Sequence, residues 1–299
     1  MSGEIELQVL TGEKPQRRLP TWLRRPMPSR GVVDTRKLLN GLRLHTVCAE
    51  AKCPNLTECW GRGTATFMIL GDWCTRRCGF CAVTTRKPLP VESDEPQRLA
   101  EAAVRLKLRH VVITSVTRDD LPDEGAGQFA ACIKAVHQAI SGVSVEVLVP
   151  DFHAREELIR LVCDAKPEVY NHNLETVARL QKHIRPAARY ERSLDVIRTV
   201  KAKYPAMKTK SGMMVGLGES LDEVETALRD LRAAGCDLLT IGQYLQPGPK
   251  QIPVAKYYPP REFERLAEIA RELGFEGVAS GPFVRSSYFA ESMYEDARD

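Results

Sequence analysis

The stretch Thr66-Phe-Met-Ile-Leu70 is followed at once by Gly71-Asp-Trp-Cys74-Thr-Arg-Arg-Cys78-Gly-Phe-Cys81. The apolar run predicts a short buried β-strand. The three cysteines have the spacing C-x3-C-x2-C, which can hold three irons of a cubane iron–sulfur cluster and leaves the fourth iron without a protein ligand. The sequence therefore predicts an iron–sulfur centre in a loop after a strand, with an open corner for chemistry.

An open iron of a low-potential cluster can bind the amino and carboxylate groups of S-adenosylmethionine and break its C5′–S bond by one-electron reduction. The alternatives for Cys74, Cys78 and Cys81 are three buried thiols or a zinc site that borrows a fourth ligand. Zinc favours cysteine pairs and a closed tetrahedron, and no second pair lies at zinc-ribbon distance.

A second triplet, Cys48, Cys53 and Cys59, precedes the first in the chain with the different spacing C-x4-C-x5-C. It lies in a polar, turn-rich stretch that is poor in packing residues. A second cluster is the simplest interpretation, and scattered core thiols are the alternative. The remaining cysteines occupy apolar positions in or beside expected helices, where we expect buried thiols rather than a fourth ligand: Cys132, Cys163 and Cys236.

After the cysteines, short β-branched or apolar runs alternate with amphipathic stretches. The expected strands are 66–70, 110–115, 144–149, 168–173, 208–215 and 238–242, with a possible late strand at 277–279. The expected helices are 97–108, 126–140, 154–165, 175–182, 190–203, 221–234 and 261–273. Ser220 and Glu223 form a capping box at the start of the 221–234 helix.

This alternation requires a parallel sheet, either closed as a barrel or open and doubly wound, and six strands suggest an incomplete barrel. In both arrangements the active site lies at the carboxyl ends of the strands. We therefore expect site residues in the loops that follow the strands: 71–81, 117–120, 150–153, 173–175, 216–219 and 243–246.

Within these loops, Asn173 and Glu175 could hold the ribose hydroxyls of the nucleoside cofactor or could belong to a capped helix start. Asp119 and Asp120 could act as an acid–base pair, but a solvated loop is the simpler interpretation.

Composition limits the class of protein. The chain has 299 residues, 43% hydrophobic and 27% charged, which suits a globular protein. Its longest apolar runs are far below the roughly 20 residues that cross a bilayer, and we find no signal peptide, so we expect a cytoplasmic protein without a membrane partner. The net charge of +4, without a long basic block, gives no case for nucleic acid.

The chain divides into four segments. Residues 1–30 are rich in proline and arginine, which predicts an extended arm or a frayed terminus. Trp22 and Leu23 could hold such an arm against the body of the protein. Residues 31–64 carry the first triplet, residues 65–281 the partial barrel, and residues 282–299 a C-terminal segment.

At this level of detail the chain resembles the lipoyl synthases of the radical S-adenosylmethionine superfamily over nearly its whole length. The phrases that carry the resemblance are those around the two triplets, 48–60 and 71–81, and those at 114–123, 171–176, 210–219, 241–247 and 279–288, the last ending in Arg285-Ser-Ser-Tyr288. The chain departs from the family in reading Asp123-Glu124-Gly125 where a Gly-Gly pair is common.

The resemblance implies a partial (β/α)6 TIM-type barrel with N- and C-terminal extensions. It implies two [4Fe–4S] clusters: one held by Cys74, Cys78 and Cys81 that cleaves S-adenosylmethionine, and an auxiliary one held by Cys48, Cys53, Cys59 and a C-terminal serine. Of Ser286 and Ser287, the family pattern points to Ser287. A hydroxyl is a harder ligand than a thiolate, so its bond to iron should open first in a cluster meant to be dismantled.

The implied reaction is the insertion of sulfur at C6 and C8 of an octanoyl chain on a lysine of a lipoyl carrier domain. The implied carriers are the E2 subunits of 2-oxoacid dehydrogenases and the glycine cleavage H protein. Ferredoxin or flavodoxin would supply electrons, and an iron–sulfur carrier protein would restore the auxiliary cluster.

Three alternatives remain open at this stage. A two-cluster electron carrier would have clusters ligated only by cysteine and no cavity at the strand ends. A structural zinc protein would hold zinc and no iron. A biotin-synthase-like sulfur inserter would share the barrel, but the first triplet and the serine ending argue against it.

Overall fold

The computed structural model describes residues 19–23 and 31–298, and the following statements concern that part of the chain. Its main sheet has eight strands in the order β1-β2-β5-β6-β7-β8-β9-β10. All of them run parallel except β1, which pairs antiparallel with β2 at one end. The strands are β1 (His45–Thr46), β2 (Thr66–Ile69), β5 (His110–Ser115), β6 (Ser144–Leu148), β7 (Val169–Asn171), β8 (Lys208–Val215), β9 (Leu238–Gln243) and β10 (Gly277–Gly281).

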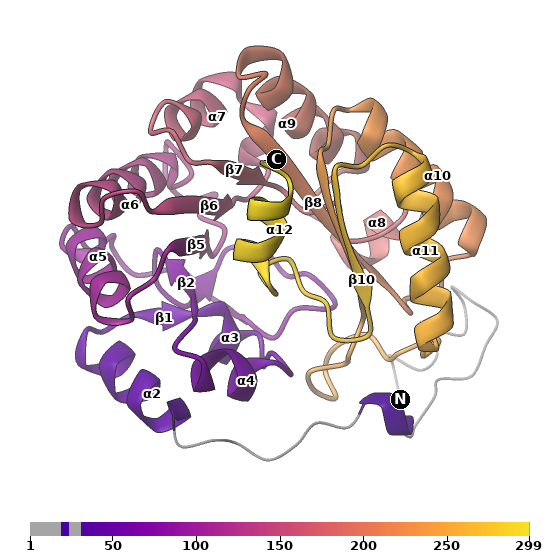
Figure 1. Cartoon of the computed structure of the whole chain (residues 1–299), viewed down its shortest axis with the longest axis horizontal. Helices are drawn as coiled ribbons and strands as arrows, with labels where there is room; N and C mark the ends of the chain where they lie inside the picture. The colour runs from indigo at the N-terminus through magenta and orange to yellow at the C-terminus, as the bar shows by residue number, and fades with distance from the viewer. Residues whose placement is uncertain (1–18, 24–30, 299) are drawn as a thin grey trace.

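The sheet is curved and the long helices cover its outer face, as Figure 1 shows. These outer helices are α5 (Glu95–Arg105), α6 (Ala126–Ala139), α7 (Glu156–Cys163), α9 (Tyr190–Lys203), α10 (Leu221–Ala233) and α11 (Pro260–Glu272). Because β1 and β10 end the strand order, the barrel is open on one side. The other helical segments are η1 (Thr21–Leu23), α2 (Gly31–Gly41), α3 (Val47–Glu50), α4 (Leu56–Gly61), η2 (Phe152–Ala154), α8 (Ala178–Ile184) and α12 (Ala290–Asp296).

The hydrophobic core lies between the sheet and these outer helices. One cluster fills the half from β2 to β7, and a second fills the half around β8 and β9. Side chains alternate along each strand, so those that do not enter this core face the concave side of the sheet. The concave side is therefore where polar residues of the strands gather.

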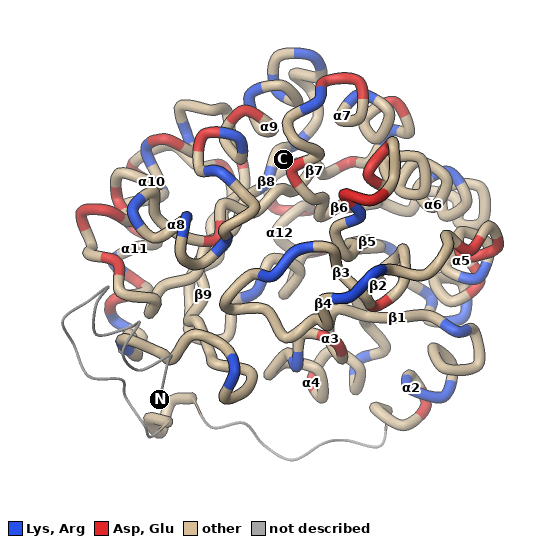
Figure 2. Tube along the Cα trace, turned by 180° about the vertical axis from the view of Figure 1, so that it is seen from behind, with Lys and Arg blue, Asp and Glu red and all other residues tan. Residues whose placement is uncertain are grey.

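Two elements lie at opposite ends of the open barrel. A two-stranded ribbon of β3 (Trp73–Cys74) and β4 (Thr84–Thr85) carries the second cysteine triplet. In Figure 1 α12 lies in front of the sheet, whereas in the reverse view of Figure 2 the β3–β4 ribbon lies in front. The triplet loop thus covers the end where the parallel strands finish.

The predicted partial barrel is confirmed. The six expected strands all form, and the possible late strand forms as β10. The capping box of Ser220 and Glu223 is present at the start of α10. No helix of the described residues is long and apolar enough to cross a membrane.

The stretch around the first triplet differs from the prediction. We expected it to be turn-rich, but it forms the short helices α3 and α4. Helices of four and six residues carry too few turns to show a periodic pattern. Most of the expected N-terminal arm, 1–18 and 24–30, lies outside the described residues. Within η1, Leu23 is buried and Trp22 is 40% exposed.

Candidate metal centres and active site

The loop that carries Cys74, Cys78 and Cys81 is anchored by backbone hydrogen bonds on both sides. The amide of Gly79 donates to the carbonyl of Ile184 at 2.8 Å, and the amide of Ile252 donates to the carbonyl of Gly79 at 2.9 Å. A Cβ atom at Gly79 would lie 2.5 Å from Ile252 Cδ1, so only glycine fits this approach without a shift. The loop is therefore held between the end of α8 and the segment after β9.

The thiols of this loop lie close enough to influence one another. Burial, with a contribution from the neighbouring Cys78 and Cys74, raises the pKa of Cys81 to about 12. Burial also raises the pKa of Cys78, against which the charges of Arg185 and Arg76 act. All three cysteines are free, partly buried thiols, which suits a cationic metal centre that binds them as thiolates and displaces their protons.

The first triplet gathers on and between two short helices. Cys48 lies in α3, Cys59 lies in α4, and Cys53 lies in the turn between them. Burial raises the pKa of Cys48 to about 11 and that of Cys59 to about 12, and the neighbouring Cys53 acts in the same direction on both. This is the same electrostatic pattern as in the second triplet, whose cysteines lie 22 to 26 residues further along the chain.

The C-terminal segment brings its two serines to different partners. Ser287 Oγ accepts a hydrogen bond from Thr66 Oγ1 at 2.7 Å, and Thr66 also hydrogen-bonds Cys48. Ser286 Oγ instead accepts a hydrogen bond from Asn173 Nδ2 at 2.7 Å. Ser287 therefore lies on the side of the first triplet, and Ser286 lies on the side of Asn173.

Two cavities adjoin at this segment. A cavity of about 310 Å³ is lined by Cys48, Cys53, Cys59 and Ser287, and Ser286 does not line it. A second cavity of about 290 Å³ is lined by Cys81, Asn173, Glu175 and both serines. The residues that line both cavities are Cys48, Cys53, Arg285 and Ser287. The two cavities thus share part of their walls, and Cys81 borders the second cavity together with Cys48 and Cys53 of the first triplet.

Asn173 and Glu175 lie together in the wall of the second cavity. Asn173 Nδ2 donates to Glu175 Oε1 at 3.0 Å, and burial raises the pKa of Glu175, with Arg185, Asn173 and Arg285 opposing the rise. Neither residue belongs to a helix: Glu175 forms an isolated bridge with Met213, and α8 begins later, at Ala178. The alternative that these two residues belong to a capped helix start is therefore wrong.

The residues fit the groups that the resemblance implies. All nine cysteines are free thiols, and six of them supply the two donor sets. Gly212 also matters for the space beside these polar groups. A Cβ atom at this position would lie 2.5 Å from Thr240 Oγ1 and 2.9 Å from Asn173 Oδ1. The absence of a side chain there keeps the floor of the second cavity open next to Asn173.

Other expectations have clear outcomes. The helix-borne cysteines Cys132, Cys163 and Cys236 are buried as expected. Asp119 and Asp120 do not form an acid–base pair, because Asp119 is bound by Arg76 and Asp120 by Arg118. Each is an exposed loop carboxylate, and the two are paired with different arginines.

Three residues at the site were missed from the sequence: Thr66, Arg76 and Arg285. Thr66 looked like the first residue of a core strand. The two arginines lie inside motifs in which we assigned roles only to the neighbouring cysteines and serines. Their position within two residues of expected ligands was the only available indication.

Comparison with known proteins places this geometry in a class. The model of the radical SAM superfamily matches residues 68–231, from β2 into α10. The solved structure of the FeFe-hydrogenase maturase HydG from Carboxydothermus hydrogenoformans is similar in fold, with a TM-score of 0.57 and 13% identity over 77% of this chain and 55% of that chain. SuiB of Streptococcus suis, bound to S-adenosylmethionine, superposes with a TM-score of 0.54 and 13% identity over 73% of this chain and 50% of that one. The fold and the cysteine loop are those of a radical SAM enzyme.

Curated relatives define the family within this class. The lipoyl synthase of Rubrobacter xylanophilus is 52% identical over 93% of this chain and 87% of that protein. The lipoyl synthase of Methylococcus capsulatus is 55% identical over 92% of this chain and 86% of that protein. The chain belongs to the lipoyl synthase family, whose members are radical SAM enzymes that use [4Fe–4S] clusters and S-adenosylmethionine.

Proposed function

We propose that this chain inserts two sulfur atoms, at C6 and C8, into an octanoyl chain that is amide-linked to a lysine of a lipoyl carrier domain. When bound, S-adenosylmethionine and the two clusters supply the one-electron chemistry that removes hydrogen from these carbons and the sulfur that replaces it. The observation that supports the proposal best is the shared cavity, which Cys81 borders together with Cys48, Cys53 and Ser287.

Cys74, Cys78 and Cys81 would hold the cluster that reduces S-adenosylmethionine. Three thiolate ligands leave one iron free for the cofactor. Asn173 and Glu175 line the same cavity as Cys81 and offer an amide and a carboxylate for the ribose hydroxyls. Their role is to orient the nucleoside toward the substrate carbon, since correct placement of reacting atoms supplies much of the rate in such reactions.

Cys48, Cys53, Cys59 and Ser287 would hold the auxiliary cluster. The hydrogen bond from Thr66 orients the Ser287 hydroxyl, and such supporting contacts fix the direction of a metal ligand. The oxygen ligand is a poorer match to a sulfide-rich cluster than the three thiolates. With this asymmetry, Ser287 would be the ligand that the cluster releases most readily.

The cavity between the two sets suits an acyl chain. Apolar side chains dominate its wall and include Val47, Phe80, Leu148, Met213, Met214 and Leu245. Apolar walls bind a hydrocarbon tail and exclude water from the reacting carbons. The tail would enter with its lysine end outward, so that C6 and C8 lie near the inner wall.

We assign residues 31–64 to the auxiliary-cluster segment, residues 65–281 to the radical SAM barrel, residues 282–299 to the serine-bearing segment and residues 1–30 to an N-terminal arm. The proposed substrates are octanoylated E2 subunits of 2-oxoacid dehydrogenases and the octanoylated H protein of glycine cleavage. Ferredoxin or flavodoxin is the proposed electron donor, and an iron–sulfur carrier protein is the proposed source of a new auxiliary cluster.

The test is a reaction of the anaerobically reconstituted protein with an octanoyl-lysine peptide, S-adenosylmethionine and dithionite. Mass spectrometry should detect 5′-deoxyadenosine and a gain of two sulfur atoms in the peptide. Cys53→Ala should retain cofactor cleavage and lose the sulfur gain, whereas Cys78→Ala should lose both. Equal behaviour of these two variants would contradict the division of labour between the triplets.

The same preparation separates the alternatives. Bound zinc in place of iron would support a structural zinc protein, and intact clusters without cofactor cleavage would support an electron carrier. A peptide that gains only one sulfur, bridging two carbons of the chain, would indicate chemistry of the biotin-synthase type.

A further inference from the structure

Arg76 is a buried cation in the middle of the second cysteine loop. Its side chain is only 6% exposed. Its Nε and Nη2 atoms donate to the two carboxylate oxygens of Asp119 at 2.8 and 2.7 Å, and Nη2 also donates to Asp151 Oδ1 at 2.9 Å. Asp119 follows β5 and Asp151 follows β6, so one guanidinium ties the loop to the ends of two parallel strands.

The backbone that presents Asp151 is strained. Phe152, His153 and Ala154 have φ values of 42°, 49° and 54°, in the left-handed region that residues other than glycine rarely adopt. Asp151 Oδ1 accepts a hydrogen bond from the amide of His153 at 3.2 Å, which stabilises this turn. Strain of this kind persists only where surrounding contacts hold it, and it clusters at functional sites. Here Asp151, whose carboxylate stabilises the strained turn, is itself bound by Arg76.

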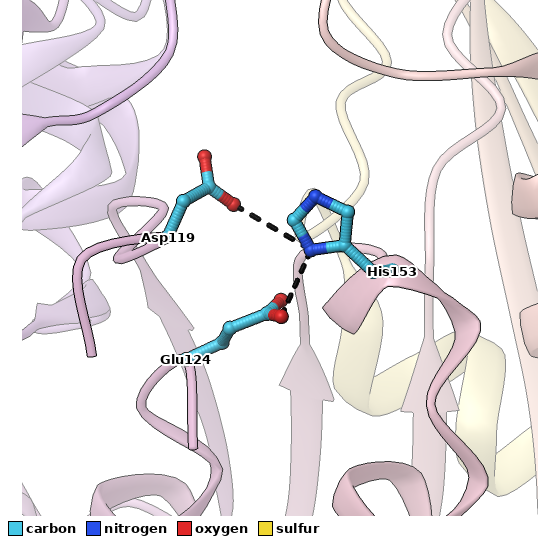
Figure 3. Close-up of side chains that lie close together, drawn as sticks. All are labelled: Asp119, Glu124 and His153. Carbon is cyan, nitrogen blue, oxygen red and sulfur yellow. Dashed lines mark hydrogen bonds and ion pairs between the residues drawn. The ribbon is translucent and has the colours of Figure 1, made fainter. Parts of the chain in front are cut away.

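The acidic groups around Arg76 are already neutralised. Figure 3 shows the ring of His153 facing the carboxylates of Asp119 and Glu124, and one side-chain atom of each of the three residues lies within 4.8 Å of the others. Each carboxylate of the surrounding cluster contacts an arginine: Asp119 contacts Arg76, Glu124 contacts Arg155, and Asp151 contacts Arg76 and Arg192. A metal ion here would have to displace guanidinium groups, so the cluster is better suited to holding Arg76 than to holding a cation.

The anchored residue also touches a cysteine sulfur. The amide of Arg76 donates to Cys74 Sγ at 3.4 Å, and the carbonyl of Arg76 accepts from Thr85 Oγ1 at 3.1 Å. Its side chain and both backbone polar groups are therefore fixed. Hydrogen bonds to cluster sulfurs are among the main determinants of a cluster's reduction potential, because they stabilise the more negative, reduced form.

We propose that Arg76 is a positioning residue that sets the reduction potential of the cluster held by Cys74, Cys78 and Cys81. The salt bridges to Asp119 and Asp151 hold the Arg76 amide against the Cys74 sulfur. This inference rests on the assignment of that cluster under the proposed function, and goes beyond it by naming what tunes the cluster.

The test uses the reconstituted Cys53→Ala protein, in which the second triplet is the only complete one. Redox titration followed by electron paramagnetic resonance gives the midpoint potential of its cluster. Arg76→Gln should shift the potential to a more negative value at unchanged iron content. Arg76→Lys should shift it in the same direction, because a single ammonium keeps the charge but cannot make the two-pronged contact with Asp119 while reaching Asp151.

The matched control is Arg77→Gln, since Arg77 is the exposed neighbour in the same loop and solvent screens its charge. Equal potentials for Arg76→Gln and Arg77→Gln would overturn the inference. A normal potential in Arg76→Lys beside a shifted one in Arg76→Gln would also overturn it, because charge alone would then be sufficient. If Arg76→Gln takes up no iron, the midpoint potential of Arg76→Lys is the test, and a potential equal to that of the parent would overturn the inference. A Cys53→Ala parent without a reducible cluster would instead contradict the ligand assignment.

Discussion

The hydroxyl of Thr66 donates a 2.7 Å hydrogen bond to the hydroxyl of Ser287, across 221 residues of the chain. It joins the start of β2 to the C-terminal segment, beside Cys48. Because the same threonine contacts a cysteine of the first triplet and the serine, it can hold both in one orientation. The contact makes Ser287, rather than its neighbour, the serine that faces the first triplet.

We therefore expect Ser287→Ala to lower the iron content of the reconstituted protein and to abolish sulfur insertion, while 5′-deoxyadenosine still forms. Thr66→Val should slow sulfur insertion by about 10-fold or more, the usual cost of losing a contact that supports a metal ligand. Iron analysis and mass spectrometry of the peptide measure both effects. Ser286→Ala is the control and should keep its auxiliary iron. If Ser286→Ala lost that iron and Ser287→Ala kept it, the ligand would be Ser286 and our assignment of Ser287 would be wrong.

Gly212 gives a test of the cofactor side of the cavity. In Gly212→Ala the new Cβ would lie 2.9 Å from Asn173 Oδ1 and 3.0 Å from Ser286 Oγ, so these groups must move. We expect the affinity for S-adenosylmethionine to fall on the order of 10-fold, because small displacements of positioning groups are costly. Equilibrium dialysis measures the dissociation constant directly.

The control for this variant is Gly41→Ala at the end of α2, where a Cβ would meet nothing within 4 Å. It should bind the cofactor as the wild type does. If Gly212→Ala bound S-adenosylmethionine with unchanged affinity, Asn173 would not be part of the cofactor site.

The barrel could be predicted from the sequence because its elements are long enough to show a period. The strands at 110–115 and 208–215 and the helix at 190–203 have the expected bounds, since runs of β-branched residues and repeated apolar positions mark them. The cysteine spacings likewise made the metal centres visible, because ligand geometry requires residues close together in the chain.

Contacts between distant segments left no such pattern. The Thr66–Ser287 bond and the Arg76–Asp119 salt bridge depend on how loops meet at the barrel ends, which no local period encodes. The short helices α3 and α4 also escaped prediction. Packing sets their position, of α3 against β1 and β2 and of α4 against α2, rather than intrinsic helix stability. Glu124 has a φ of 49°, so the position favours glycine, yet its carboxylate is held by His153 and Arg155.

A buried ion pair on the concave side of the sheet predicts a large effect on stability. Lys210 Nζ lies 2.9 Å from both carboxylate oxygens of Glu146, and the two side chains are 0% and 1% exposed. Asn171 Nδ2 also donates to Glu146, so β6, β7 and β8 are joined. Lys210→Met leaves the buried carboxylate without its ammonium partner, with Asn171 and the His110 ring, 3.7 Å away, still beside it, and should lower the free energy of unfolding by about 3 kcal/mol.

Urea denaturation followed by circular dichroism measures this loss. The double variant Lys210→Met with Glu146→Leu removes both charges and should be less destabilised than the single variant. A double variant that is destabilised by the sum of both single losses would show that the two charges do not interact.

Stability at acid pH should report on the helix cap of α10. Glu223 accepts hydrogen bonds from Arg179 Nε at 2.7 Å and from the amide of Ser220 at 2.8 Å, which lower its pKa to about 2. A carboxyl whose pKa is depressed by folding stabilises the protein above its unfolded value, near 4.5, and this contribution is lost as the pH falls toward 2. Glu223→Gln should cost roughly 1 kcal/mol at neutral pH, since cap and salt bridge are partly solvated.

The difference between wild type and Glu223→Gln should therefore shrink as the pH is lowered from 4.5 toward 2, because the wild-type carboxyl becomes protonated and resembles the amide. Urea midpoints of the cluster-free proteins at pH 7, 4 and 3 measure the trend. Glu225→Gln is the control, since Glu225 pairs with Arg229 on the same helix without touching the cap, and it should change the midpoint little at neutral pH. A Glu223→Gln deficit that stays constant down to pH 3 would mean that the carboxylate charge contributes nothing to the cap.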